Sequence, residues 1–335
     1  MKRIFTIILT IFAIIANNNL NAQNQNFENV LNGGTADANL YLKEFMNPVA
    51  YSIGNGLANG WYNTAKPHKT LGFDLSFNVN LATIPDVAKS FEFLESDYST
   101  LQIDGPATSA SLPTFAGGET TTELLINGTT QTIVAPSGIE EQLGDYPGPL
   151  AIPTPTIQLG IGIIKNTDLI IRYTPEITAG DFSFQSFGFG VKHDFKQWIP
   201  GMKLLPFDLS ALAGYNNIST TYQIDETAGQ FAEFNASATT VQAIISKKLL
   251  FFTPYAGVGV NIVRSNFALN GTYVVEENGE TIELTDPLGF DFDGSGGPRF
   301  TVGFRLKFLW ALALNVDYTI QKYNTLSVGF GINVR

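Results

Sequence analysis

The sequence contains no cysteine among its 335 residues. This excludes a disulfide framework and a lipid anchor on an amino-terminal cysteine. Charged residues make up only 15% of the chain, whereas soluble proteins carry about 25%. Beyond residue 22, no apolar run approaches the roughly 18 residues that a spanning helix needs. A low content of charged residues together with the lack of a spanning helix is typical of a membrane β-barrel, in which half of each strand faces lipid.

Basic residues are also scarce, with 19 Lys and Arg against 30 Asp and Glu. Nucleic-acid binding depends on clustered Lys and Arg, so this balance argues against a nucleic-acid partner. A secreted soluble β-sandwich would share the composition, and it would be recovered without detergent. The strand pattern has to distinguish the two classes.

The first 22 residues have the features of a secretory signal peptide. Lys2 and Arg3 precede an apolar stretch at residues 4–15, and a small residue, Ala22, ends a polar Asn-rich run. This order is typical of a cleaved leader, and the apolar stretch is too short to span a bilayer comfortably. We expect cleavage after Ala22 and export to the outer membrane of a Gram-negative cell. Cleavage removes two basic residues and leaves 17.

Apolar residues alternate with small or polar residues in several segments. In residues 70–84 one face carries Leu71, Phe73, Leu75, Phe77, Val79 and Leu81. The last ten residues, LSVGFGINVR, repeat the alternation. Period two is the signature of a β-strand, and about 9 to 11 such residues cross a membrane obliquely.

The same pattern occurs in ten segments. They are residues 70–84, 156–164, 169–176, 182–193, 204–224, 231–246, 252–267, 299–308, 311–321 and 326–335. We therefore predict an all-β fold, an antiparallel transmembrane β-barrel of about ten strands. Eight or twelve strands are also consistent, because the parity of residues 182–191 is ambiguous and a bulge there would explain it.

The connections between these strands are of two kinds. Two long acidic loops, 86–155 and 270–297, are expected outside the cell, with a small hairpin around Asn127-Gly128 in the first. Tight basic turns are expected in the periplasm; they lie at Lys165, 196–203, Lys247 and Lys307.

The chain before the barrel, residues 23–66, begins with a flexible polar lead-in. Residues 36–60 then have apolar residues at spacings near four, which predicts an amphipathic helix interrupted or kinked by Pro48. The helix would lie in the periplasm or in the barrel mouth, where it could act as a plug. Residues 67–335 form the predicted barrel.

Residues 56–77, GLANGWYNTAKPHKTLGFDLSF, carry a resemblance. They resemble the start of an uncharacterised family of exported barrel proteins from Bacteroidota, which implies an outer-membrane location. A helical segment followed by a barrel is also similar in architecture to the outer-membrane fatty-acid channels. Resemblance to other outer-membrane proteins further implies that the last strand is recognised by the barrel-insertion machinery.

Charged residues occur on the polar faces of the predicted strands. They are Asp74, Arg172, Lys192, Asp208, Arg305, Lys307 and Asp317. An Arg or Lys facing hydrocarbon would cost about 2 to 4 kcal/mol at mid-membrane, so these side chains are expected in the lumen. They form either an ion-pair lattice that braces a narrow barrel, which we favour, or the lining of a path for a small polar solute.

The sequence carries no pattern that predicts an enzyme. His68 and His193, the two histidines, are expected at the periplasmic rim, and His68 has no partner ligand two or four residues on. The acidic residues of 291–296 lack the far ligand of a calcium loop. We expect no metal, no cofactor and no catalytic residue.

Two functions remain open. The first is a passive or gated channel for a small, apolar solute, and the second is a closed structural or surface-interaction barrel. In both, the lipid of the outer membrane surrounds the protein. Conductance of the protein in planar bilayers separates the two.

Deletion of residues 326–335 should abolish assembly, because a barrel cannot tolerate an open edge in hydrocarbon. Trimming of the loop at 270–297 should leave assembly intact. Heat-modifiable migration on a gel measures both, and normal insertion of the chain without residues 326–335 would refute the barrel.

Overall fold

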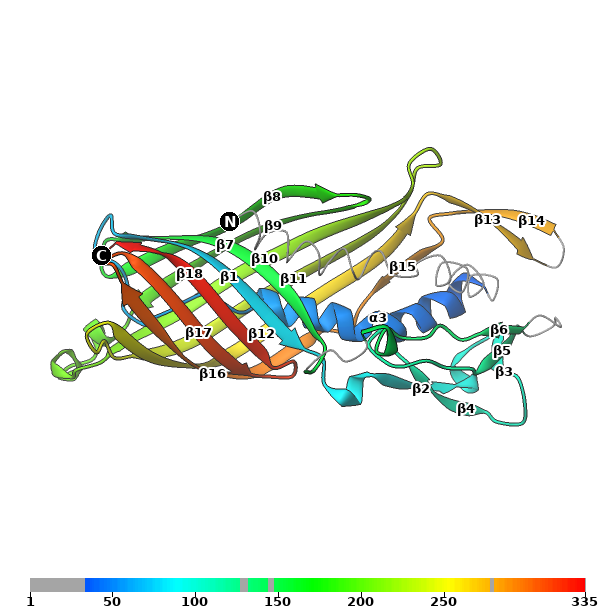
Figure 1. Ribbon diagram of the computed structural model, residues 1–335, viewed down its shortest axis with the longest axis horizontal. Helices are drawn as coiled ribbons and strands as arrows, with labels where there is room; N and C mark the ends of the chain where they lie inside the picture. Colours follow the sequence, from blue (N-terminus) through cyan, green and yellow to red (C-terminus); the bar gives the residue numbers. More distant parts are fainter. Residues whose placement is uncertain (1–33, 127–131, 144–147, 278–279, 335) are drawn as a thin grey trace.

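A computed structural model describes residues 34–126, 132–143, 148–277 and 280–334. The expected signal peptide and the Asn127-Gly128 turn lie outside these residues. Ten antiparallel strands form a barrel (Figure 1). It is closed, since β1 (Phe73–Thr83) pairs with β18 (Thr325–Val334) from Phe73 opposite Val334 to Ala82 opposite Thr325. The predicted fold class and the strand number of ten are therefore confirmed.

The other eight strands of the wall follow the predicted order. They are β7 (Ala151–Ile163), β8 (Thr167–Ala179), β9 (Phe182–Asp194), β10 (Asp208–Asp225), β11 (Gln230–Ser246), β12 (Phe252–Asn270), β16 (Ser295–Phe308) and β17 (Leu312–Ile320). Two details were wrong. Residues 202–204 form the 3₁₀-helix η5 (Met202–Leu204) and not the start of a strand, and the bulge lies in β8, between Thr174 and Ile177.

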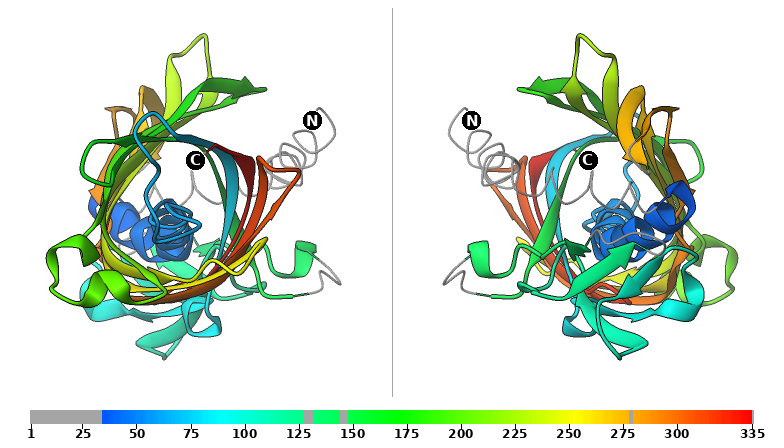
Figure 2. Two further views of the ribbon diagram at one scale, coloured as in Figure 1. Left: turned by 90° about the vertical axis from the view of Figure 1, so that its left-hand side faces the viewer. Right: turned by 90° about the vertical axis from the view of Figure 1, so that its right-hand side faces the viewer.

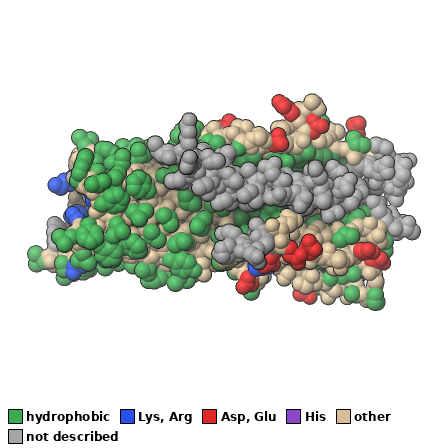
Figure 3. All heavy atoms as spheres, viewed as in Figure 1, with side chains coloured by type: hydrophobic (Ala, Val, Ile, Leu, Met, Phe, Trp, Pro, Cys, Tyr) green, Lys and Arg blue, Asp and Glu red, His purple; other side chains and the backbone are tan. Residues whose placement is uncertain are grey.

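The outside of the barrel is apolar, and its two ends differ in charge. Leu75, Ile171 and Phe330 are each 45 to 48% exposed on the outer face. One end, the turn end, carries the short connections after β7, β9, β11 and β16, and basic side chains gather there; acidic side chains gather at the loop end (Figure 3). Exposed Trp198 and Trp310 lie in connections at the turn end, as interface anchors do in membrane proteins.

One helix, α3 (Thr35–Leu57), enters the ring of strands from the loop end (Figure 2). It contacts β1, β7, β11, β12 and β16. The expected interruption at Pro48 is wrong, because the helix is continuous through this residue. In the part of the chain that the structure describes, no helix has both the length and the hydropathy to cross a membrane.

The first long connection folds into a small unit that packs against α3. We call it the outer unit (residues 86–150). It contains β2 (Ser90–Leu94) paired with β4 (Ser109–Pro113), and β5 (Glu123–Ile126) paired with both β3 (Leu101–Ile103) and β6 (Thr132–Val134). The predicted hairpin is therefore present as β5 and β6. Buried Phe93, Leu101, Leu112 and Leu124 pack in one core with Ala38, Tyr41 and Phe45 of α3.

The second long connection is more structured than predicted. β13 (Thr272–Glu277) and β14 (Glu280–Thr285) form a hairpin, and β15 (Leu288–Asp291) pairs with β12. β15 pairs with the barrel wall and Ser295 already belongs to β16. A deletion in this connection that leaves assembly intact must therefore end before β15. Asp293, which the sequence placed in a candidate calcium loop, instead pairs with Lys43 of α3 at 2.8 Å.

Asp37 joins α3 to the outer unit. Its carboxylate accepts the backbone N–H groups of Ser99, Thr100 and Leu101 at 2.6 to 3.0 Å. Burial acts to raise the pKa of Asp37, but these hydrogen bonds outweigh it and hold the pKa below the ordinary value of 3.8. Its contribution to docking is therefore complete above about pH 4 and is lost as the pH falls through the lowered pKa.

We expect the Asp37→Asn variant to lose amide protection at residues 99–101 at neutral pH, because a neutral amide oxygen is a weaker acceptor. The wild type should keep this protection down to about pH 4 and lose it in stronger acid. Hydrogen exchange measures both, with Asp86→Asn in the same unit as the control. Equal protection in the wild type and Asp37→Asn would contradict the assignment.

Candidate functional site: the plugged lumen

The lumen is filled by one segment of the chain. After α3, residues 58–68 continue down the bore to the turn end, where β1 begins. Small wall residues make room for this segment, since a Cβ on Gly190 or Gly214 would meet the ring of Trp61. We call residues 35–68 the plug.

Two wall arginines hold the end of α3. Arg172 donates to the carbonyl oxygens of Leu57 at 3.0 Å and Asn59 at 2.7 Å, and it stacks on Trp61 with 3.7 Å to the ring centroid. Arg299 donates to the carbonyl oxygen of Ala58 at 2.8 Å. The last carbonyls of a helix lack partners of their own and carry partial negative charge, so these cations cap the helix from the wall.

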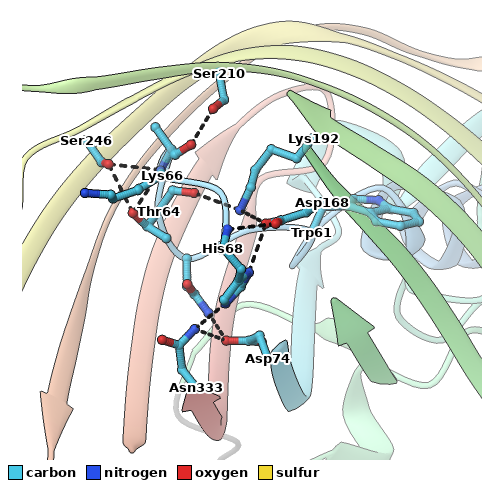
Figure 4. Close-up of polar contacts among 12 residues, drawn as sticks. Trp61, Thr64, Lys66, His68, Asp74, Asp168, Lys192, Ser210, Ser246 and Asn333 are labelled. Atoms are coloured by element: carbon cyan, nitrogen blue, oxygen red, sulfur yellow. Dashed lines mark hydrogen bonds and ion pairs between the residues drawn. The ribbon is translucent and has the colours of Figure 1, made fainter. Parts of the chain in front are cut away.

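A second cluster fastens the plug near the turn end (Figure 4). Asp168 of β8 accepts the backbone N–H of His68 at 2.8 Å and lies 3.1 Å from its Nδ1. Lys192 of β9 is 3.0 Å from the same carboxylate and donates to the Thr64 carbonyl at 3.4 Å. All three ionisable side chains are at most 5% exposed. Buried charges of this kind persist only when they are paired and hydrogen-bonded.

The same cluster reaches the strand that closes the barrel. The Asn333 amide of β18 donates to Asp74 of β1 at 2.8 Å and lies 2.8 Å from His68 Nε2. This geometry fits an Nδ1–H that donates to Asp168 and an Nε2 that accepts from this amide. Lys307 donates to the Asn333 carbonyl at 2.9 Å. One network thus joins the plug to both sides of the closing seam.

The structure places most of the predicted charged residues inside the barrel. The buried ones are Asp74, Arg172, Lys192, Arg305 and Asp317. Arg305 donates to Asn63 of the plug at 3.1 Å, and Asp317 accepts the Tyr255 hydroxyl at 2.8 Å. Lys307 and Asp208 are half-buried nearer the turn end. These side chains contact both the plug and neighbouring residues of the wall.

The two histidines differ in position. His68 is buried in the cluster near the turn end. His193 lies at the end of β9, with Thr167 Oγ1 and Trp198 Nε1 each 2.8 Å from its ring nitrogens. Among the described residues, no group of three His, Asp or Glu side chains is arranged to hold a metal.

Two residues of the site were missed in the sequence. Asp168 was assigned to a tight turn, and Arg299 was not singled out within its strand. Strand parity could have found both, because Asp168 shares its face with Arg172 and Arg299 shares its face with Arg305.

The fold and the filled lumen define a plugged β-barrel of the outer-membrane type. The chain belongs to a family of unknown function (DUF6588), whose model matches residues 1–334. No curated protein matches the chain.

Solved structures with a similar fold include three outer-membrane barrels. The attachment invasion locus protein Ail of Yersinia pestis is 6% identical, with 79% of this chain and 98% of that chain covered and a TM-score of 0.28. The translocator domain of the autotransporter NalP from Neisseria meningitidis is 10% identical, with 89% and 98% covered and a TM-score of 0.30. The monoaromatic hydrocarbon channel CymD is 8% identical, with 86% and 99% covered and a TM-score of 0.23.

We expect Asp168→Asn to destabilise the folded barrel by about 3 to 5 kcal/mol, because Lys192 loses the carboxylate that compensates its buried charge. Adding Lys192→Met should recover most of this loss. The urea midpoint of the heat-modifiable band measures both effects. Asp181→Asn, at an exposed acid of the loop end, is the control, and an Asp168→Asn midpoint equal to that of the control would contradict the role of the cluster.

Proposed function

We propose that the protein is an integral outer-membrane barrel that acts as a gated channel for a small, apolar solute and is closed at rest by the plug. The observation that carries the proposal is how the lumen is filled. A narrow barrel is ordinarily filled by the side chains of its own wall. Here the wall keeps small residues, such as Gly190, Gly214 and Gly257, where the plug approaches. A separate segment can leave such a bore, whereas wall side chains cannot.

The contacts of the plug fit a gate that closes firmly and can still open. The wall holds residues 57–65 in part through backbone carbonyls, which accept from Arg172, Arg299, Lys192 and Ser210. Water can replace each of these hydrogen bonds when the segment moves, so the net cost per bond is only about 0.5 to 1.5 kcal/mol, or about 1.5 to 3 kcal/mol where the donor is charged.

The proposed location follows from the surface. The apolar outer face suits lipid, and the long connections lie at one end, as in bacterial outer-membrane barrels. We infer export through a signal peptide cleaved after Ala22, in a Bacteroidota-type cell, and insertion by the barrel-insertion machinery through β18. A closed surface-interaction barrel is the competing function, and the outer unit docked on α3 is the observation that favours it.

Gly56→Val should loosen the plug, because a Cβ at Gly56 would meet Thr154 Oγ1 of the wall. Overpacking costs about 1 to 3 kcal/mol, so the open population should rise by about fivefold or more. Single-channel recording in planar bilayers measures it. Gly289→Val is the matched control, since nothing lies within 4 Å of the position of its Cβ. A correctly folded Gly56→Val barrel as silent as the wild type would favour the closed surface barrel.

A further inference from the structure

The wall is not uniformly paired. β7 and β8 form only six residue pairs, from Ile163 opposite Thr167 to Gln158 opposite Arg172. Beyond Gln158, residues 151–157 of β7 continue to pair with β1, and β8 continues to pair with β9 to Ala179. We call residues 151–157 of β7 and 173–179 of β8 the parted seam. Across it, the two neighbouring strands form no residue pairs.

Two prolines lie on the β7 edge of the parted seam, at Pro153 and Pro155. Residues of β7 with even numbers turn their backbone groups toward β1, since Leu150 accepts from Ile84 and Gly162 donates to Gly72. In an antiparallel strand the odd-numbered residues then face the other neighbour, β8. Each proline therefore removes an N–H that would face β8, as prolines do on strand edges. β8 also carries Pro175 in its irregular stretch.

The parted seam borders the apolar outer face of the barrel. Pro153 and Pro155 pair with Leu81 and Val79 of β1, which belong to the apolar outer face. On β8, Tyr173 is 60% exposed and is the last apolar outward residue before Pro175. An unpaired N–H in hydrocarbon costs several kcal/mol, so prolines lower the cost of leaving this seam open.

Polar groups without partners lie on the lumen side of the same stretch. The hydroxyls of Thr154 and Thr156 are buried, each residue being 2% exposed, and neither has a hydrogen-bond partner among the described residues. Thr154 faces Gly56 of the plug. Arg172 beside them is already occupied by Gln158 and plug carbonyls, so the free hydrogen-bonding capacity on the lumen side of the seam is uncharged.

We propose that the parted seam is a lateral portal through which a single-chain amphiphile with an uncharged hydroxyl or amide head passes between the lumen and the external leaflet. The head binds Thr154 and Thr156, and the chain lies between the proline edge of β7 and Tyr173. This use of the portal in transport rests on the proposed function and names its substrate class.

Photolabelling tests the portal. The probe is dodecanol with a diazirine on its chain, and the protein is the full chain in lipid vesicles. Labels are expected on lumen-facing Thr156 and Gln158 as well as on lipid-facing residues such as Phe330. Thr154→Val with Thr156→Val should reduce the lumen labels by about fivefold or more, because two hydrogen bonds to the head are lost, and leave Phe330 labelling unchanged.

Pro153→Val with Pro155→Val restores the two N–H donors and should close the seam, so that lumen labels are lost and lipid-facing labels remain. Pro298→Val in β16 is the matched control and should keep both sets. Lumen labelling that persists in a correctly folded Pro153→Val/Pro155→Val barrel, or labels confined to the lipid face in the wild type, would overturn the portal.

A second variant closes the seam after the protein has folded, so that misfolding cannot explain a loss of lumen labelling. The chain has no cysteine, so Ile157→Cys with Tyr173→Cys forms a unique pair beside the last paired residues. Oxidation should remove lumen labelling reversibly; unchanged labelling in the cross-linked protein would overturn the portal. If the Gly56→Val variant conducts no current while lumen labelling of the wild type is normal, the gated channel alone is rejected. If Gly56→Val conducts and the wild type shows no lumen labelling, the portal alone is rejected.

Discussion

The structure depends on one constraint, that backbone N–H and C=O groups in an apolar surrounding must find partners within the chain. The ladder between β1 and β18 meets it by closing the sheet, with ten consecutive residue pairs. Closure then creates a bore that the chain must fill or leave open. The segment before β1 enters this bore from the loop end and leaves it where the first strand starts.

The polar contents of the bore follow from the same constraint. Once side chains alternate between lipid and lumen, charged residues can only point inward, where they need partners. Here the partners come largely from the plug, as with Arg172 on the end of α3 and Asp168 on His68. The wall and the plug therefore complete each other, through hydrogen bonds as well as apolar packing.

Much of this could be predicted from the sequence, because alternation has a direct physical cause. Period two placed Asp74, Arg172 and Asp317 on the lumen face before any pairing was known. Asp168 was missed because it was assigned to the turn before β8, although its parity within that strand matches that of Arg172. The burial of His68 and its contacts with Asp168 and Asn333 were also beyond prediction, because they follow from the path of residues 58–68 through the bore, which local pattern does not encode.

The parted seam illustrates which features of the protein follow from its sequence and which follow only from its tertiary structure. The sequence by itself determined the fold class, the strands, the side on which each side chain points and the positions of Pro153 and Pro155. Only the tertiary structure decided which strand each backbone edge faces, that the plug occupies the lumen, and that Asp168, Lys192 and His68 meet. Side-chain direction is a local property of the backbone, whereas these contacts join residues up to 100 positions apart and exist only after the sheet has closed around the plug.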